Sequence, residues 1–345
     1  MKTTHLIAFS AVATIAVAAA AAADARTLRL QTSTTSGDAS FKYMTEVWAP
    51  RLAEMTDGSL EIELLPTKSV VPHRETPDAV SIGVLDGDMN SILYFAGKDP
   101  AFAIMGDLIA GYDTPEQVQT FCAHGGGKEM LQEIYDAHYP GRIHVIGCGP
   151  YTREALVSTV PIRGVADLEG RTIRAPEGLA SEIFRRAGAS PVAIPFSEVY
   201  TSLEKGIVDA ADASAYVNND ATGMHRIAQY PIYPGIHSQA VNQFILNAGV
   251  WEELTPAEQT AVETWYAAAW SDLRRYTDLR DRELVARDRA EGEIEVIDWD
   301  QADRDAFRAI AAEAWEDVAA QNALATKALD THKAFMSMIG LAEDD

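Results

Sequence analysis

Residues 165–213 read VADLEGRTIRAPEGLASEIFRRAGASPVAIPFSEVYTSLEKGIVDAADA, and this stretch decides the fold class. Short apolar segments, typical of buried strands, alternate in it with segments whose apolar residues recur at helical spacing. Strands that alternate with helices indicate an α/β fold whose sheet is mostly parallel and covered on both faces. The expected strands are Thr172–Ala175, Val192–Ile194 and Val208–Ala213, and the expected helices are Val165–Leu168, Leu179–Ala187 and Ser197–Lys205.

The same rhythm occupies the first half of the chain. Strands are predicted at Leu28–Ser33, Leu60–Leu64, Met89–Tyr94 and Ile143–Ile146, and helices at Phe41–Met55 and Ala79–Leu85. The turns Gly83–Asp86 and Gly206–Asp209 have the same pattern, which either indicates a duplicated lobe or reflects a common helix-to-strand turn. A chain of this length exceeds what one hydrophobic core usually serves, so two lobes are expected.

The last third of the sequence is helical. Pro256–Ala290 predicts one helix of ~50 Å, long enough to span both lobes, and Asp303–Met338 is predicted to be helical. No linker rich in Pro, Gly or Ser separates the lobes, so ordered segments must cross between them and leave a cleft that closes by a hinge motion. The predicted division assigns residues 26–150 plus about 240–278 to the first lobe and 151–239 plus about 279–345 to the second.

The N-terminus has the pattern of a secretory signal peptide. Met1-Lys2 precedes the apolar run Leu6–Ala23, and Ala23-Asp24-Ala25 has the small-x-small form of a cleavage site. We predict that residues 1–25 are removed on export to the periplasm; the alternative is a retained anchor. No later stretch approaches ~18 consecutive apolar residues, so the mature chain is expected not to insert into a membrane.

Charge and cysteine content narrow the classes of partner. The chain has 28 basic and 51 acidic residues, a net charge of −23, and would be repelled by nucleic acid and by anionic membrane surfaces. Its two cysteines, Cys122 and Cys148, can form a disulfide in an oxidising compartment, but the sequence leaves open whether they meet.

Motifs of catalysis are absent from the sequence. It contains no GxSxG, no HExxH, no phosphate-binding loop and no GxGxxG that follows a strand. A candidate binding residue is Arg174, at the end of an expected strand where open α/β sheets bind ligands. Its planar guanidinium matches a carboxylate, although position alone equally allows a surface salt bridge.

Several motifs resemble one known family. Val165–Arg174, Gly188–Val192 and Phe196–Ala210 are similar to the core of the DctP-type substrate-binding proteins, which serve tripartite ATP-independent periplasmic (TRAP) transporters. The resemblance covers nearly the whole mature chain. It continues in Gly58–Ile62, in Tyr94–Phe102 and in Tyr233–Ser238, the last similar to the branch that includes binders of 2-oxo acids.

The resemblance implies a two-lobed periplasmic binding protein fold and no enzymatic activity. It assigns the ligand carboxylate to Arg174, with Arg153 as a second arginine, and a Ca²⁺ or Na⁺ ion beside the ligand to Asp212 and the carbonyl of Ala213. The family's tryptophan is replaced here by Ala213 and an acidic ligand by His237, so a second interpretation stays open, in which Asp212 accepts hydrogen bonds from a ligand hydroxyl. No cofactor is required.

Further cleft residues are expected at strand and loop ends: Tyr94, Tyr151, Tyr216, Asn218 and His237. Their hydroxyl, amide and imidazole groups suit a polyfunctional acid. The function that this sequence predicts is capture of a small organic acid and its delivery to the membrane subunits of a TRAP permease. The alternatives are a binding protein for an amino acid or sugar that serves another transporter class or a signalling receptor, and a hydrolase or isomerase on a two-lobed scaffold.

Overall fold

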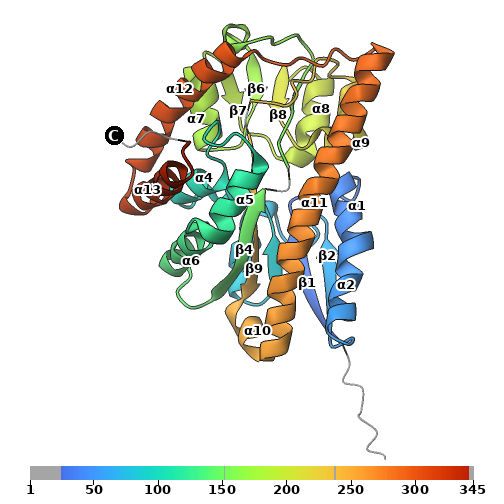
Figure 1. Cartoon of the computed structure of the whole chain (residues 1–345), viewed down its shortest axis with the longest axis vertical. Helices are drawn as coiled ribbons and strands as arrows, with labels where there is room; N and C mark the ends of the chain where they lie inside the picture. The colour runs from blue at the N-terminus through green and yellow to red at the C-terminus, as the bar shows by residue number, and fades with distance from the viewer. Residues whose placement is uncertain (1–24, 151, 237, 342–345) are drawn as a thin grey trace, which may run out of the picture.

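The computed structural model describes residues 25–150, 152–236 and 238–341, and it shows two α/β lobes, each built on its own sheet. The first sheet has the order β2-β1-β3-β9-β4 and the second the order β5-β8-β6-β7. In Figure 1 the first lobe is the lower one and the second lobe the upper one. The strands are β1 (Arg26–Thr32), β2 (Leu60–Leu65), β3 (Gly87–Met89), β4 (Ile143–Pro150), β5 (Leu156–Ser158), β6 (Thr172–Arg174), β7 (Ser190–Val192), β8 (Ala210–Asp212) and β9 (Val241–Asn247).

Helices cover both sheets. The first lobe has α1 (Ala39–Tyr43), the π-helical turn η1 (Met44–Trp48), α2 (Ala49–Met55), η2 (His73–Glu75), α3 (Thr76–Ser81), η3 (Ile92–Phe95), α4 (Pro100–Gly106), α5 (Pro115–His124), α6 (Gly127–His138) and α10 (Ala248–Glu253). The second has η4 (Val165–Leu168), α7 (Leu179–Arg186), η5 (Phe196–Glu198), α8 (Val199–Glu204), α9 (Tyr216–Ala221) and η6 (Met224–Arg226). The C-terminal helices are α11 (Pro256–Glu291), α12 (Gln301–Ala319) and α13 (Ala323–Met338).

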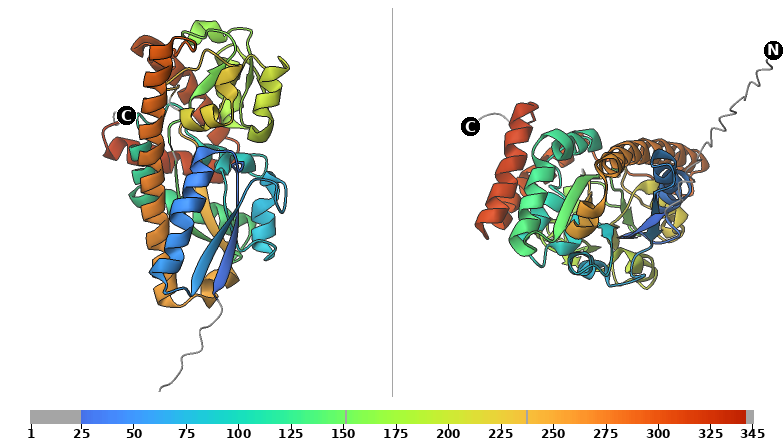
Figure 2. Two further views of the ribbon diagram at one scale, coloured as in Figure 1. Left: turned by 90° about the vertical axis from the view of Figure 1, so that its right-hand side faces the viewer. Right: turned by 90° about the horizontal axis from the view of Figure 1, so that it is seen from below.

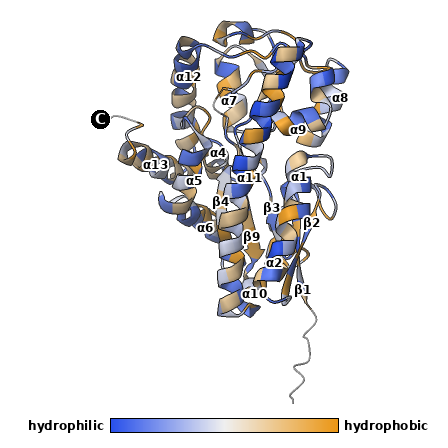
Figure 3. Ribbon diagram, turned by 45° about the vertical axis from the view of Figure 1, so that its right-hand side comes forward, coloured by the Kyte–Doolittle hydropathy of each residue, from blue (hydrophilic) through white to orange (hydrophobic). Residues whose placement is uncertain are grey.

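The sheets are mixed, whereas the sequence predicted mostly parallel ones. In the first sheet β1 pairs in parallel with β2 and β3, but β9 is antiparallel to both β3 and β4. The antiparallel pairing of β4 and β9 arises because β4 carries the chain toward the second lobe and β9 brings it back in the opposite direction. β9 itself is almost entirely buried and apolar in part, and it lies inside the first sheet (Figure 3).

Helix α11 joins the two lobes. It begins at a capping box formed by Thr255 and Glu258, ends at Gly292, and runs beside both sheets (Figure 2). Against the first lobe, the indole nitrogen of Trp270 donates to the carbonyl oxygen of Gly149 over 2.9 Å. A side chain at Gly147 would collide with Tyr266, because an added Cβ would lie 2.3 Å from the ring. Glycine in β4 therefore allows the helix to approach the sheet closely.

Against the second lobe, α11 uses the carboxylate of Asp281, which is fully buried. Its Oδ1 accepts a hydrogen bond of 2.7 Å from the backbone nitrogen of Val217, in the first turn of α9. Burial raises the pKa of Asp281 to about 8. This carboxyl group thus links the long helix to α9, and its burial favours the protonated, uncharged form.

The pKa of Asp281 predicts a pH dependence of stability. Because the folded-state pKa lies above the unfolded value of about 3.9, the folded state holds the proton more tightly and loses stability as the pH rises toward 8. Asp281→Asn keeps the acceptor for Val217 and removes the charge. At pH 8 we expect the variant to be more stable than the wild type by more than about 1 kcal/mol, with the difference shrinking toward about pH 5. Urea unfolding across this pH range measures it; parallel profiles would contradict the assignment.

The segment 303–338, which was predicted to be helical, forms two helices. It is divided at Ala320–Asn322, where the side chain of Asn322 accepts a hydrogen bond from the nitrogen of Ala325 and begins α13. The break lets α12 pack on α7 while α13 packs on α4 and α6, beside the first sheet. Within the predicted second-lobe range 279–345, α13 therefore contacts the first lobe; the exact lobe boundaries stay a prediction.

The two cysteines, whose pairing the sequence left open, form a disulfide that joins α5 to β4. Their Cα atoms are 5.5 Å apart and both side chains are buried. The predicted signal peptide lies, except for its last residue, outside the described residues. Among the described residues, no helix combines the length and the apolar character needed to cross a bilayer.

Candidate functional site

A pocket between the two lobes contains Arg174 and is called here the arginine pocket. About 480 Å³ of space free of protein atoms lies within it, counted together with the solvent at its open side. Residues of the first lobe, at the carboxyl ends of β1 and β3 and the start of β9, face residues of the second lobe across it. The lining residues are Ser33, Thr34, Ser91, Leu93, Tyr94, Glu154, Arg174, Pro176, Phe196, Ala213, Ser214, Ala240 and Asn242.

Arg174 ends β6, and its side chain is fixed by the backbone of the second lobe. β6 pairs in parallel with both β7 and β8, so the carboxyl ends of these strands meet at the edge that faces the pocket. Nε donates to the carbonyl oxygen of Ile194 over 2.7 Å, and Nη1 donates to the carbonyl oxygen of Asp212. The residue is only 3% exposed. A guanidinium held in this way presents its charge to the pocket without needing to reorganise.

Two further polar side chains enter the pocket from the first lobe. Tyr94 comes from η3; burial raises the pKa of its hydroxyl, an effect that the charge of Arg174 opposes. The hydroxyl is therefore protonated at neutral pH and can donate. Asn242, at the start of β9, makes no side-chain hydrogen bond to another described residue and offers its amide to a ligand.

A group of carboxyl side chains lies beside Arg174. The hydroxyl of Ser238 is 2.6 Å from Oδ2 of Asp107 and 3.1 Å from Oε2 of Glu154. Burial raises the pKa of Asp107 to about 8, and the neighbouring charge of Asp212 adds to the shift. Burial also raises the pKa of Asp212, while the charge of Arg174 lowers it. Oδ2 of Asp212 is buried and accepts no hydrogen bond from the described residues.

Of the residues predicted from sequence, Arg174, Tyr94 and Ala213 line the pocket, and Asp212 adjoins it through its backbone contact with Arg174. The structure does not bring Arg153, Tyr216 or Asn218 into its lining. Tyr151 and His237 lie outside the described residues. Sequence reasoning missed Glu154, Asn242 and Asp107; only their types, acidic or amide groups near strand or helix ends, could have suggested them.

Arg153 faces away from the pocket. Its Nη2 donates to the carbonyl oxygen of Asp113 over 2.9 Å, and the side chain lines a separate surface hollow with Tyr233 and Arg282. The next residue, Glu154, lines the arginine pocket instead. Neighbouring side chains of an extended segment point to opposite sides, so a one-residue ambiguity in the spacing reverses the assignment.

Tyr216 and Asn218 are engaged in contacts with other elements. The hydroxyl of Tyr216 donates to Oδ2 of Asp288 on α11, over 2.5 Å. Oδ1 of Asn218 accepts from both the backbone nitrogen and the hydroxyl of Ser40, each over 3.1 Å. Ser40 belongs to the first lobe, so Asn218 connects α9 to α1 across the lobes.

Ion pairs also link the lobes at the rim of the cleft. Arg74 lies 2.9 Å from Glu177, and Lys68 lies 3.1 Å from Glu198. All four side chains are substantially exposed, so each pair contributes only about 0–1 kcal/mol. Pairs this weak do not by themselves hold the lobes together.

One further group of metal-ligand type lies in the second lobe and against α11, away from Arg174. Candidate atoms of Asp220, His225 and Asp288 lie within 4.8 Å of one another. The guanidinium of Arg287 already contacts both carboxylates, at 2.8 Å and 2.6 Å. This positive charge occupies the position that a cation would need, so the group is best described as an ion-pair network.

The family model described as DctP, bacterial extracellular solute-binding protein, family 7, matches residues 30–322. The chain belongs to this family. The DctP proteins are substrate-binding proteins and not enzymes, and the fold of this DctP chain agrees with solved members. It has 38% identity to a TRAP periplasmic solute-binding protein of Rhodobacter sphaeroides in an apo open structure, with a TM-score of 0.75 over 92% of this chain and 100% of that one.

Two other DctP relatives are associated with identified ligands. The monocarboxylate 2-oxoacid-binding periplasmic protein of Nostoc sp. is 26% identical over 299 residues, which is 85% of this chain and 80% of the relative. A TRAP solute-binding protein of Bordetella bronchiseptica, with bound calcium and picolinate, is 24% identical, with a TM-score of 0.80 over 92% of this chain and 94% of that one. The relatives support a periplasmic location for this DctP protein.

Proposed function

We infer that this DctP protein captures a small organic acid anion in the arginine pocket and delivers it to a TRAP-type permease. The observation that carries the proposal is the buried guanidinium of Arg174, held by two backbone carbonyls at the junction of the lobes. A buried cation with no carboxylate paired to it in the described part of the structure suits an anionic ligand. The ligand carboxylate would supply the direct ion-pair partner that the described carboxylates do not give this guanidinium.

Capture follows from the arrangement of the pocket. Arg174 belongs to the second lobe, whereas Tyr94 and Asn242 belong to the first, so a ligand contacts both lobes only when the cleft is closed. That difference in contacts shifts the population toward the closed form. Micromolar affinity requires about −8 kcal/mol, which a charged hydrogen-bonded contact, several neutral hydrogen bonds and desolvation together supply.

The carboxyl side chains that lie beside Arg174 fit a hard cation such as Ca²⁺ or Na⁺. The test of fit is the buried Oδ2 of Asp212, which accepts no hydrogen bond from the described residues and lies beside a donor set made of oxygen atoms. Asp212, Glu154 and the carbonyl of Ala213 would hold the ion, which would supply positive charge for the ligand's anionic oxygens. Arg174 binds and orients the carboxylate whether or not the ion is present.

Transport requires export and a partner. We assign export to the signal peptide 1–25 and release of ligand to the membrane subunits of a TRAP permease that recognises the closed form. The net charge of −23 opposes the approach of an anion at long range. Salt screens this repulsion over ~8 Å at physiological ionic strength, so the charge of Arg174 dominates for an anion at the pocket.

A ligand screen tests the proposal. The mature protein is to be heated with a panel of monocarboxylates, dicarboxylates, oxo acids and sugar acids, each with and without calcium, and with amino acids and neutral sugars as comparison. A ligand at about 100 times its Kd stabilises the folded state by about 2.7 kcal/mol, so an organic acid is expected to raise the Tm clearly. Calorimetry then gives its Kd. A Tm that rises only with neutral sugars or amino acids would refute the assignment.

A further inference from the structure

The surface hollow that contains Arg153 lies where the chain crosses between the lobes, and it is called here the Arg153 hollow. Arg153 comes from the crossing between β4 and β5, and Tyr233 and Pro234 come from the return toward β9. Most of its other lining residues belong to α11, which spans both lobes. The Arg153 hollow has about 460 Å³ of space open to water. In the described part of the chain it shares no lining residue with the arginine pocket.

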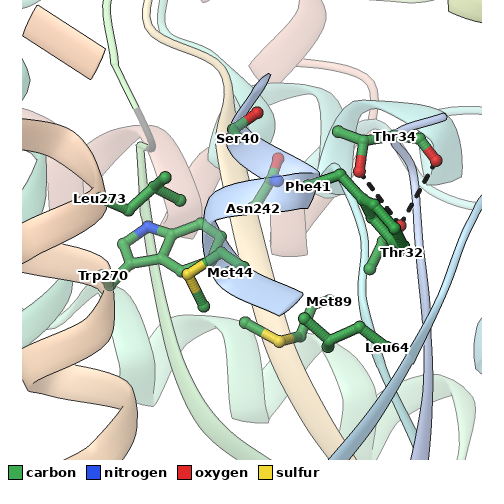
Figure 4. A pocket seen from close by; sticks show the side chains of 10 residues that line it. All are labelled: Thr32, Thr34, Ser40, Phe41, Met44, Leu64, Met89, Asn242, Trp270 and Leu273. Carbon is green, nitrogen blue, oxygen red and sulfur yellow. Dashed lines mark hydrogen bonds between the residues drawn. The ribbon is translucent and has the colours of Figure 1, made fainter. Parts of the chain in front are cut away.

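Its size sets the Arg153 hollow apart from a smaller hollow beside the arginine pocket. The smaller one is walled mainly by apolar side chains, among them Met44, Trp270 and Leu273 (Figure 4). It has only about 30 Å³ of space open to water, which is room for about one or two water molecules. That space is too small for a ligand group, whereas the Arg153 hollow combines space with charge.

Positive charge exceeds negative charge around the Arg153 hollow. The charged side chains of its lining are Arg153, Arg282, Arg289, Asp278 and Asp298. Each carboxylate already has an arginine partner: Asp278 lies 3.0 Å from Arg282, and Asp298 pairs with Arg304 beside the hollow. Within the described residues, Arg153 and Arg289 have no carboxylate at ion-pair distance. Two positive charges are thus left uncompensated on a chain whose net charge is −23.

Arg153 is the most constrained of these arginines. Its side chain is half-buried, and Nη2 donates to the carbonyl oxygen of Asp113 over 2.9 Å. A guanidinium has five N–H donors, so most of those of Arg153 remain available to a ligand. Burial lowers the pKa of Arg153, and the neighbouring charges of Arg304 and Arg282 lower it further. Like charges held together in a partly buried place favour an anion that neutralises them.

Tyr233 adds a neutral donor to the same hollow. Burial raises the pKa of its hydroxyl, and the carboxyl groups of Asp281 and Asp278 add to the shift. The hydroxyl is therefore protonated at neutral pH. It makes no side-chain hydrogen bond to another described residue, so it can donate to a ligand.

We propose that the Arg153 hollow binds a doubly charged oxyanion, such as phosphate or sulfate, through Arg153, Arg289 and the hydroxyl of Tyr233. Two positive charges without partners are neutralised by one dianion. The planar fork of a guanidinium matches the oxygens of such an anion with parallel hydrogen bonds. Chloride supplies one charge and no second acceptor atom, so it binds more weakly. The anion is soluble, because the strongly acidic chain is repelled by an anionic bilayer.

Equilibrium dialysis of the mature protein against radiolabelled phosphate tests the inference. The ionic strength is set to the physiological value with sodium chloride, at a slightly alkaline pH where phosphate is a dianion. The wild type is expected to bind one phosphate per chain, which sulfate displaces. Arg153→Gln should weaken phosphate binding at least about tenfold, because charge-assisted hydrogen bonds are lost. Arg289 is exposed, so Arg289→Gln tests the same site with little risk to the fold and should weaken binding as well.

Arg280→Gln is the matched control. Arg280 also lies on α11, but it pairs with Glu283 and does not line the Arg153 hollow. The variant removes the same charge and should bind phosphate as the wild type does. An equal loss in Arg280→Gln would mean that phosphate responds only to overall charge and would overturn the inference. The absence of saturable phosphate binding by the wild type would overturn it too.

Two further arms locate the anion. Arg174→Gln is expected to keep phosphate binding, and its loss there would place the anion in the arginine pocket and reject the second site. Vesicles of phosphatidylglycerol are expected not to retain the protein. Retention that disappears in Arg153→Gln would assign the phosphate to a lipid headgroup and overturn the assignment to a soluble anion.

Discussion

Replacing Arg174 by glutamine is expected to weaken binding of an organic acid ligand by at least about 30-fold, because truncating one partner of a buried, hydrogen-bonded charge pair costs about 2–5 kcal/mol. The amide keeps one donor for the backbone carbonyls of Ile194 or Asp212, so the loss falls mainly on the ligand. Calorimetry with the tightest acid from the ligand screen measures the change, and circular dichroism confirms that the lobes remain folded.

Arg153→Gln is the matched control for this experiment. Arg153 is also a partly buried arginine that donates to a backbone carbonyl, but it lines a different hollow from that of Arg174. The variant is expected to bind the acid with wild-type affinity. Near-native affinity in Arg174→Gln would refute the assignment of the carboxylate, and a large loss in Arg153→Gln would favour the site expected from the spacing of the two arginines.

Removal of the disulfide is expected to have the largest effect on stability. Cys122 and Cys148 are separated by 26 residues, and closing a loop of that length stabilises the folded state by about 3 kcal/mol in the chain-entropy description. The double variant Cys122→Ala, Cys148→Ala should therefore melt roughly 5 °C or more below the wild type.

Reductant provides the control for the disulfide. Melting in dithiothreitol should lower the Tm of the wild type toward that of the double variant and leave the double variant unchanged. Because the bond joins α5 to β4 within the first lobe and neither cysteine lines the arginine pocket, ligand affinity should be little affected below the melting range. Identical melting of wild type and variant under oxidising conditions would show that the cysteines are not paired in solution.

Local patterns predicted most of the secondary structure near Arg174. The strand Thr172–Ala175 corresponds to β6, the helix 179–187 to α7, and the helix 256–290 to α11. In each, side-chain periodicity and a terminating residue act over a few positions, so the signal is contained in the segment itself. The predicted strand Met89–Tyr94 is less accurate, because the strand β3 is Gly87–Met89 and residues from Ile92 form a 3₁₀ turn that carries Tyr94 to the pocket.

The candidate site was only partly predictable. Arg174 followed from its place at a strand end and from the family resemblance, and the structure puts it in the interlobe pocket. Asn242 was not anticipated because β9 carries no strong alternation: it is buried on both faces. Arg153 was predicted to line the pocket, but Glu154 lines it instead, because the direction of a side chain in an extended segment changes with every residue.

The sequence by itself determined the α/β class, the long helix α11, the family and the arginine that binds the proposed ligand, since these depend on short-range patterns and ordered motifs. Only the tertiary structure decided which polar residues surround that arginine and that the cysteines pair. The arginine pocket joins residues as distant in sequence as Thr34 and Arg174, and it depends on how the two lobes pack. Contacts between such distant segments arise from packing, which no local pattern encodes.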